Sequence, residues 1–401
     1  MKFKAKIDKN VLKYTICMIP FFKLQTFDMF VSQNYQVKLW SLIENIFNLG
    51  MVLLTAYFVY KFINKGTKPH NISTIGIAIY FFACIVICIC NGSFYFGLVY
   101  NGITCIGLAV LLEEILYKSS ILLEKCCGWL FGIYSIIGAT LNIVMPYGFL
   151  STSNKAIAIY FLGSKNSSYF YFAIFMYFLT LRYLKKEKGI LELAIPIFLL
   201  AGLYFCDSKG GLVCVGISVL YFFIIHFWNK IYKLICPQLL LAILGMIFYF
   251  VVFSPNIPLL SNGLHLIGKD LEYGGRTVLW QSAIKMYTQH PLLGNGAQLI
   301  LMNKTAQTQA HNFYLDQLAR FGTLPLLVIL TNIICIVSLS IKRDNKKVVA
   351  LKSVFIFSFL LHCIFDTTSI RFLVLIMTVI ECSGSNINKK FSILKKKDLQ
   401  I

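Results

Sequence analysis

Residues 72–112 read ISTIGIAIYFFACIVICICNGSFYFGLVYNGITCIGLAVLL, and this stretch decides the fold of the chain. Two long apolar segments, 72–90 and 94–112, flank a short polar turn, and the whole stretch contains no Asp, Glu, Lys or Arg. A helix of about 17 to 25 apolar residues crosses the roughly 30 Å of hydrocarbon in a bilayer. The stretch therefore predicts two membrane-spanning helices joined by a tight connection.

The same composition extends along the chain. Of its 401 residues, 58% are hydrophobic and only 13% are charged, and a water-soluble domain could not bury so much apolar surface. We predict an all-α polytopic membrane protein with about twelve transmembrane helices, forming a single membrane domain over residues 1–401. The other expected spans are 14–31, 40–62, 128–149, 168–184, 190–206, 211–228, 234–253, 321–341, 353–368 and 370–383.

The basic residues predict the orientation of these spans. The formal net charge is +21, and most of the 37 Lys and Arg lie at alternate ends of successive apolar segments, as the positive-inside rule expects. We expect a multi-pass protein of a bacterial cytoplasmic membrane with both termini in the cytoplasm. Because the bilayer accounts for the basic clusters, nucleic acid is not expected as a partner.

One connection is long, running from 254 to 314 between the ninth and tenth spans. Loops of this length are usually functional or disordered. Within it, residues 277–289 (TVLWQSAIKMYTQ) place Val278, Trp280, Ala283, Ile284 and Tyr287 on one helical face. We expect a short amphipathic helix on the outer surface of the membrane, ended by the Gly-rich turn at 294–296.

Three cationic or titratable residues fall on the outer side, against the orientation rule. Lys209 lies between two apolar segments, Arg276 precedes the amphipathic helix, and His311 lies where the chain re-enters the membrane. An Arg fork matches phosphate oxygens, and an imidazole with a reference pKa of about 6.5 is suited to general-base work. Each also has a plainer interpretation: a turn neutralised by Asp207, anchoring to lipid headgroups, or an interfacial side chain.

Taken in order, the motifs resemble the O-antigen ligase and polymerase superfamily. The resemblance rests on DSKGG (207–211), GGRTVLWQSAIKMYTQHPLLGNG (274–296) and AHNFYLDQLARFG (310–322), and on FLGSKNSS (161–168) earlier in the chain. It implies transfer of a glycan from an undecaprenyl-diphosphate carrier to an acceptor hydroxyl, with inversion and without a metal. No cofactor is expected, and the sequence contains no metal-binding motif.

The resemblance also implies roles for individual residues. Arg276 would bind the carrier diphosphate, and His311 would act as the general base on the acceptor. Lys209 stands where the family has an arginine, and a lysine keeps the charge but loses the bidentate fork. Weaker candidates for substrate binding are Asn312, Trp280, Tyr314, Lys165 and Asn166, although the membrane interface would also account for the aromatic residues.

Three functions remain open at the level of the sequence. The first is a polymerase of lipid-linked repeat units for a capsule, O-antigen or exopolysaccharide, working with a flippase and a chain-length regulator. The second is a ligase that passes the glycan to another acceptor. The third, a flippase or other transporter, fits less well, since transporters place charged sites near mid-membrane and Lys209, Arg276 and His311 map to the outer boundary.

Overall fold

The computed structural model describes residues 8–32, 37–65, 71–151, 158–185, 193–228, 230–253, 276–297, 301–302, 306–307, 309–367 and 369–383. Helices make up nearly all of this part of the chain. The helices are α1 (Lys9–Met18), η1 (Ile19–Phe22), α2 (Gln25–Ser32), α3 (Val37–Asn64), α4 (Ile72–Cys90), α5 (Phe96–Lys118), α6 (Ser120–Val144), α7 (Ser168–Leu184), α8 (Ala194–Phe205), α9 (Lys209–Phe227), η3 (Ile231–Lys233), α10 (Pro237–Phe253), α12 (Arg276–Gln289), α13 (Phe313–Phe321), α14 (Thr323–Arg343), α15 (Lys346–Phe365) and α16 (Ile370–Cys382).

Strands are few and short in the described residues. Two antiparallel hairpins join β1 (Leu150–Ser151) to β2 (Ala158–Ile159) and β3 (Leu301–Met302) to β4 (Ala306–Gln307). Seven helices, α3, α4, α5, α6, α9, α14 and α15, are long and apolar enough to cross a membrane, and α8 and α10 are shorter apolar helices. The all-α polytopic membrane fold is thereby confirmed, while the number of twelve crossings stays a prediction.

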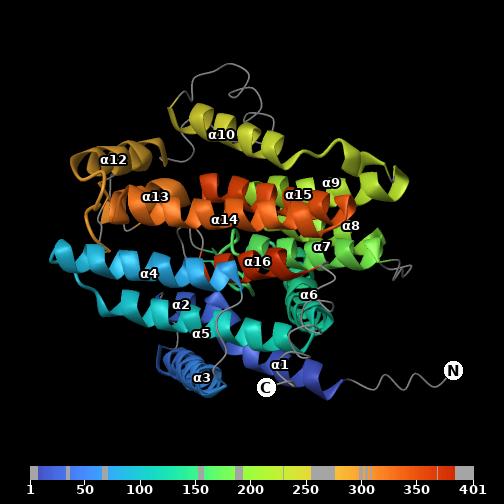
Figure 1. Ribbon diagram of the computed structural model, residues 1–401, viewed down its shortest axis with the longest axis horizontal. Helices are drawn as coiled ribbons and strands as arrows, with labels where there is room; N and C mark the ends of the chain where they lie inside the picture. Colours follow the sequence, from blue (N-terminus) through green and yellow to red (C-terminus); the bar gives the residue numbers. More distant parts are fainter. Residues whose placement is uncertain are drawn as a thin grey trace, which may run out of the picture.

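The helix α15 forms the centre of the bundle. It packs against α7, α9 and α10. Within its apolar 18-residue segment, 83% of the residues are buried inside the protein, compared with 17% for the corresponding segment of α3 at the periphery. A helix that is apolar on all sides is stable only in a protein core or in lipid. The burial of α15 places it in the core, and the exposed surface of α3 suits contact with lipid. Figure 1 shows α15 in the middle of the molecule and α3 at its lower edge.

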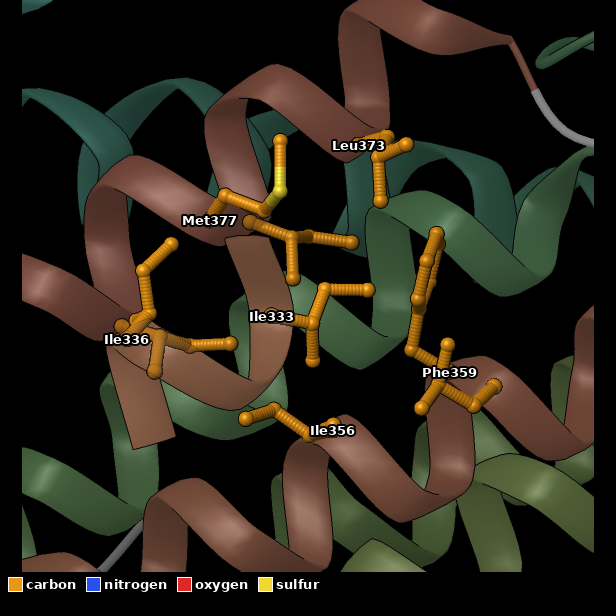
Figure 2. A pocket seen from close by; sticks show the side chains of 9 residues that line it. Ile333, Ile336, Ile356, Phe359, Leu373 and Met377 are labelled. Carbon is orange, nitrogen blue, oxygen red and sulfur yellow. The ribbon is translucent and has the colours of Figure 1, made fainter. Parts of the chain in front are cut away.

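The packing around α15 is tight. Figure 2 shows Ile333, Ile356, Leu373 and Met377 converging from α14, α15 and α16 on one small apolar cavity. Its volume is only ≈ 10 Å³, at the lower limit of about 10 to 15 Å³ that a single water needs. This cavity is therefore a packing feature of the helix contacts and too small for a substrate.

The first expected span, 14–31, is wrong as a single helix. The chain breaks into α1, η1 and α2, with Pro20 inside η1 and Lys23 just after it. A proline supplies no backbone N–H to a continuing helix. Lys23 Nζ pairs with Asp28 at 2.8 Å and with Glu44 at 3.1 Å, and this charged cluster fills the break.

Most other expectations for the elements are confirmed. The helix expected at 277–289 is α12, which packs on α13. Its buried face contains Trp280 and Ala283 as expected, but Leu279 is buried in place of Val278, which is 47% exposed. Its position on the membrane surface stays a prediction, and the first part of the long connection, 254–275, lies outside the described residues.

Candidate functional site

The carboxylate of Asp366 brings together side chains from distant parts of the chain. Asp366 follows the last residue of α15, and its side chain is 15% exposed. Asn166 Nδ2 donates to Asp366 Oδ2 at 2.7 Å, and the Nδ1 atom of His311 lies 3.3 Å from Oδ1. The sequence indicates Asn166 and His311 as separate candidates and does not indicate Asp366, whose carboxylate joins them.

Arg276 lies beside the same carboxylate. It is the first residue of α12, and its Nη1 donates to the backbone carbonyl of Phe365, the residue before Asp366. Burial by itself would raise the pKa of Asp366. The hydrogen bond with His311 and the positive charges of His362, Arg276 and His311 outweigh burial and lower this pKa to about 2.

The backbone holds His311 in an unusual conformation. Among the described non-glycine residues, only His311, with a φ of 50°, and Asp207, with a φ of 54°, adopt positive φ. Such strain persists only where the surroundings fix it. Here Ala310 N donates to Asp316 Oδ1 at 3.1 Å, and Ala310 O accepts from Trp280 Nε1 at 3.1 Å, so the residue before His311 is held at both ends.

Three of the weaker candidates lie behind this site and not on its surface. Trp280 is 1% exposed and donates its indole N–H to Ala310. Asn312 is 0% exposed and caps α13 by accepting from Leu315 N, and Tyr314 donates to the carbonyl of Leu360 at 3.0 Å. In this structure these side chains hold His311 in place and leave no ring face open for stacking on a sugar.

A second charged group adjoins the first through Asn166. Asp207 lies between two cations, 3.0 Å from Lys165 Nζ and 3.8 Å from Lys209 Nζ. Ser208 Oγ donates to Asn166 Oδ1 at 3.4 Å, so the turn before α9 contacts the residue that binds Asp366. Lys165, Lys209 and Asp207 are all partly exposed, and exposed ion pairs are weak, so an anionic ligand can compete with Asp207 for both cations.

The segment that carries Lys165 and Asn166 is held by α2. Thr26 Oγ1 donates to the carbonyl of Tyr160 at 2.7 Å, and Ser167 Oγ donates to Gln25 Oε1 at 2.6 Å. Gly163 turns between them with a φ of 118°, a value that suits glycine. The broken first span thus serves the site, because its second half supports this turn.

The turn after α12 has a structural role. Asn295 N donates to Ala319 O at 3.0 Å and Gly296 N donates to Arg320 O at 2.8 Å, which docks the turn on α13. Gly294 has a φ of 60°, and a Cβ there would lie 2.3 Å from the carbonyl oxygen of Arg320. The glycines of this motif therefore allow a close backbone approach that fixes α12 against the helix following His311.

The arrangement matches the needs of proton abstraction beside a phosphate site. When Nδ1 of His311 donates to Asp366, its Nε2 is left as a proton acceptor, and the ring is accessible, with 39% of the side chain exposed. Arg276, Lys209 and Lys165 supply positive charge nearby. Within the described ranges, no group of three His, Cys, Asp or Glu residues is arranged to hold a metal ion.

Comparison with known families identifies the part of the chain that carries most of this site. Residues 194–331, which include Lys209, Arg276 and His311, match the family model described as O-antigen ligase. This match supports the resemblance of the chain to the O-antigen ligase and polymerase superfamily. The match ends before Asp366, and Lys165 and Asn166 precede it, so the family segment is completed by residues on either side of it. No curated protein is similar enough in sequence to match the chain.

Proposed function

We propose that this protein is a polysaccharide polymerase that joins undecaprenyl-diphosphate-linked oligosaccharide repeat units on the outer face of a bacterial cytoplasmic membrane. The product would be a capsule, an O-antigen or an exopolysaccharide. The observation that supports this most directly is the contact of His311 with Asp366 at 3.3 Å, beside Arg276. It combines a base with cations, as attack by a sugar hydroxyl on a lipid diphosphate requires.

The proposed reaction is a single displacement with inversion. The acceptor hydroxyl gives its proton to His311 Nε2 while its oxygen forms a bond to the anomeric carbon of the donor. The bond from that carbon to the diphosphate oxygen breaks, and the electron pair leaves on the diphosphate. Asp366 stabilises the imidazolium that forms, and Arg276 with Lys209 and Lys165 stabilises the leaving group.

A ligase that passes a finished glycan to a different acceptor is the second candidate, and the matching family is described by the name O-antigen ligase. The two differ only in the acceptor, so the same base and cations serve both. In either function, the donor and acceptor approach from the bilayer and its outer surface. A flippase and a chain-length regulator are the partners that a polymerase would need.

The variant His311→Ala tests the proposal. The protein should insert normally, while polymer formation falls by about a hundred-fold or more because the general base is lost. A polymerase would then accumulate single lipid-linked repeats, whereas a ligase would accumulate long chains still attached to the lipid carrier. Analysis of lipid-linked glycans by length separates these outcomes.

His290→Ala is the matched control. His290 is exposed, and it accepts a hydrogen bond from Gly294 through its backbone only, so its side chain should be dispensable. Normal polymer length in His311→Ala would eliminate the general-base role. Equal loss in both variants would attribute the effect to disturbance of this part of the protein.

A further inference from the structure

A second hollow lies at the far end of α7 from the candidate site. The helix starts at Ser168, beside Asn166, and its 17 residues separate its ends by about 25 Å at roughly 1.5 Å per residue. Near its other end, α1, α6 and α7 enclose a groove of ≈ 600 Å³. We call this hollow the α6–α7 groove. Its volume lies within the range of about 300 to 1,000 Å³ that is typical of small-molecule sites.

One end of the α6–α7 groove is an apolar slot. Trp129 and Ile133 of α6 and Phe175 of α7 line it, and Trp129 and Ile133 are 54% and 46% exposed. Gly128 lies in the same wall, and a Cβ added there would have no atom within 4 Å. The slot is therefore open and runs along the bundle wall, as an acyl chain would require.

The other end of the α6–α7 groove, which we call its mouth, is charged. Glu124, Lys125 and Arg182 line it together with Asp8 at the start of α1. Glu124 is 11% exposed, and its Oε2 pairs with Lys185. Its Oε1 is buried and has no hydrogen-bond partner among the described residues. A buried carboxylate oxygen without a donor is unfavourable, so this atom favours a ligand that brings an N–H group.

The charged residues at the mouth therefore suit a ligand that carries both a positive and a negative charge. Glu124 and Asp8 suit an ammonium group, and the exposed cations Lys125 and Arg182 suit a phosphate. A lipid that carries both groups on its headgroup would place its acyl chain in the apolar slot. A quaternary ammonium has no N–H for Glu124 Oε1, and an uncharged glycerol headgroup has no cation for it.

We propose that the α6–α7 groove binds phosphatidylethanolamine, with the primary ammonium on Glu124, the phosphate on Lys125 and Arg182, and one acyl chain beside Gly128. This lipid site is separate from the candidate catalytic site and does not depend on the proposed reaction. With the orientation predicted from the basic residues, it takes its lipid from the cytoplasmic leaflet.

Native mass spectrometry of the full-length protein in detergent, with equal amounts of phosphatidylethanolamine, phosphatidylcholine and phosphatidylglycerol, tests the proposal. Retention of phosphatidylethanolamine should exceed that of the other two by about ten-fold, the effect of one charge-assisted hydrogen bond. Gly128→Leu should abolish this retention, because the new side chain fills the slot. Glu124→Gln should retain lipid but lose the preference for the primary amine.

Gly245→Leu is the matched control. Gly245 lies in α10, away from the groove, and a Cβ there also meets nothing within 4 Å, so this variant should retain lipid like the parent protein. Equal retention of the three lipids by the parent, or unchanged retention by Gly128→Leu, would overturn the proposal. Binding of phosphatidylglycerol alone would assign the groove to an anionic lipid instead.

Discussion

Asp366 is the residue on which the protonation of the candidate site depends. Its pKa of about 2 lies below the ordinary aspartate value of 3.8, so the side chain is ionised at every pH at which a membrane protein normally works. The contribution of a lowered carboxylate pKa to stability is present above the ordinary value and is lost as the pH falls towards 2. A loss of activity between pH 7 and 5 would therefore not come from protonation of Asp366.

Asp366→Asn separates a positioning role from a purely structural one. The amide keeps the shape but removes the charge that stabilises a protonated imidazole, so the rate should fall by about 10² to 10⁴. The acidic limb of the pH–rate profile should also move to lower pH. Asp207→Asn removes an exposed carboxylate on the same surface and should leave that limb in place. An unshifted limb in Asp366→Asn would remove the carboxylate from the mechanism.

His311, Arg276 and Asn166 could be predicted as candidates from the sequence but Asp366 could not, and the reason is physical. Asp366 is 55 residues from His311 and belongs to no local motif, so only tertiary packing brings the two together. A signal was nevertheless present, because Asp366 fell inside the expected span 353–368, where an ionisable residue marks a functional position. The opposite happened with the aromatic candidates. The sequence indicated Trp280 as a possible substrate-binding residue, but it cannot reveal that this side chain is buried.

At the scale of elements, α2 determines where Lys165 and Asn166 lie. Apolar content alone predicted one span over 14–31, although Pro20 and Lys23 were visible signs of a break. Apolar length was a better guide for α4 and α14, whose regular helices need no polar partners to be recognised. The sequence therefore predicts the long helices well, but it does not predict the short elements that support the site.

Gly163→Ala tests this support. Gly163 has a φ of 118°, and a Cβ there would lie 2.6 Å from Cβ of Gln25. Strain of about 1 to 3 kcal/mol would push the turn away from α2 and displace Asn166 from Asp366. The thermal midpoint should fall and polymer formation should drop by about ten-fold or more, since about 1.4 kcal/mol changes a rate ten-fold.

Gly245→Ala provides the control for this substitution, because it adds a methyl group to an exposed helical glycine with open space around it. A helix-interior alanine is more favourable than glycine by about 1 kcal/mol, so this variant should be at least as stable as the parent. If Gly163→Ala keeps full activity and stability, the turn at 160–167 does not depend on α2 in the manner described.

At the scale of the whole molecule, the structure gathers Lys209, Arg276 and His311 without reference to a membrane. Their association through Asp366 and Asn166 agrees with the orientation predicted from the basic residues, which had placed all three on the outer side. The agreement is informative because the distribution of charges along the chain and the hydrogen bonds between helices distant in sequence are independent observations.

Three native cysteines test the orientation directly. Cys90, Cys236 and Cys335 are exposed free thiols. Cys90 ends α4 next to Asn91, whose side chain donates to Leu293 at 2.9 Å in the long connection, so it lies on the side of the candidate site. Cys236 precedes α10 on the opposite side, and Cys335 lies midway along α14, where lipid would cover it.

A membrane-impermeant maleimide should label Cys90 in intact cells and Cys236 only after permeabilisation, with Cys335 unlabelled in both, as read by peptide mass spectrometry. Labelling of Cys236 in intact cells with Cys90 protected would invert the topology and place His311 in the cytoplasm, where a lipid-linked glycan on the outer face could not reach it.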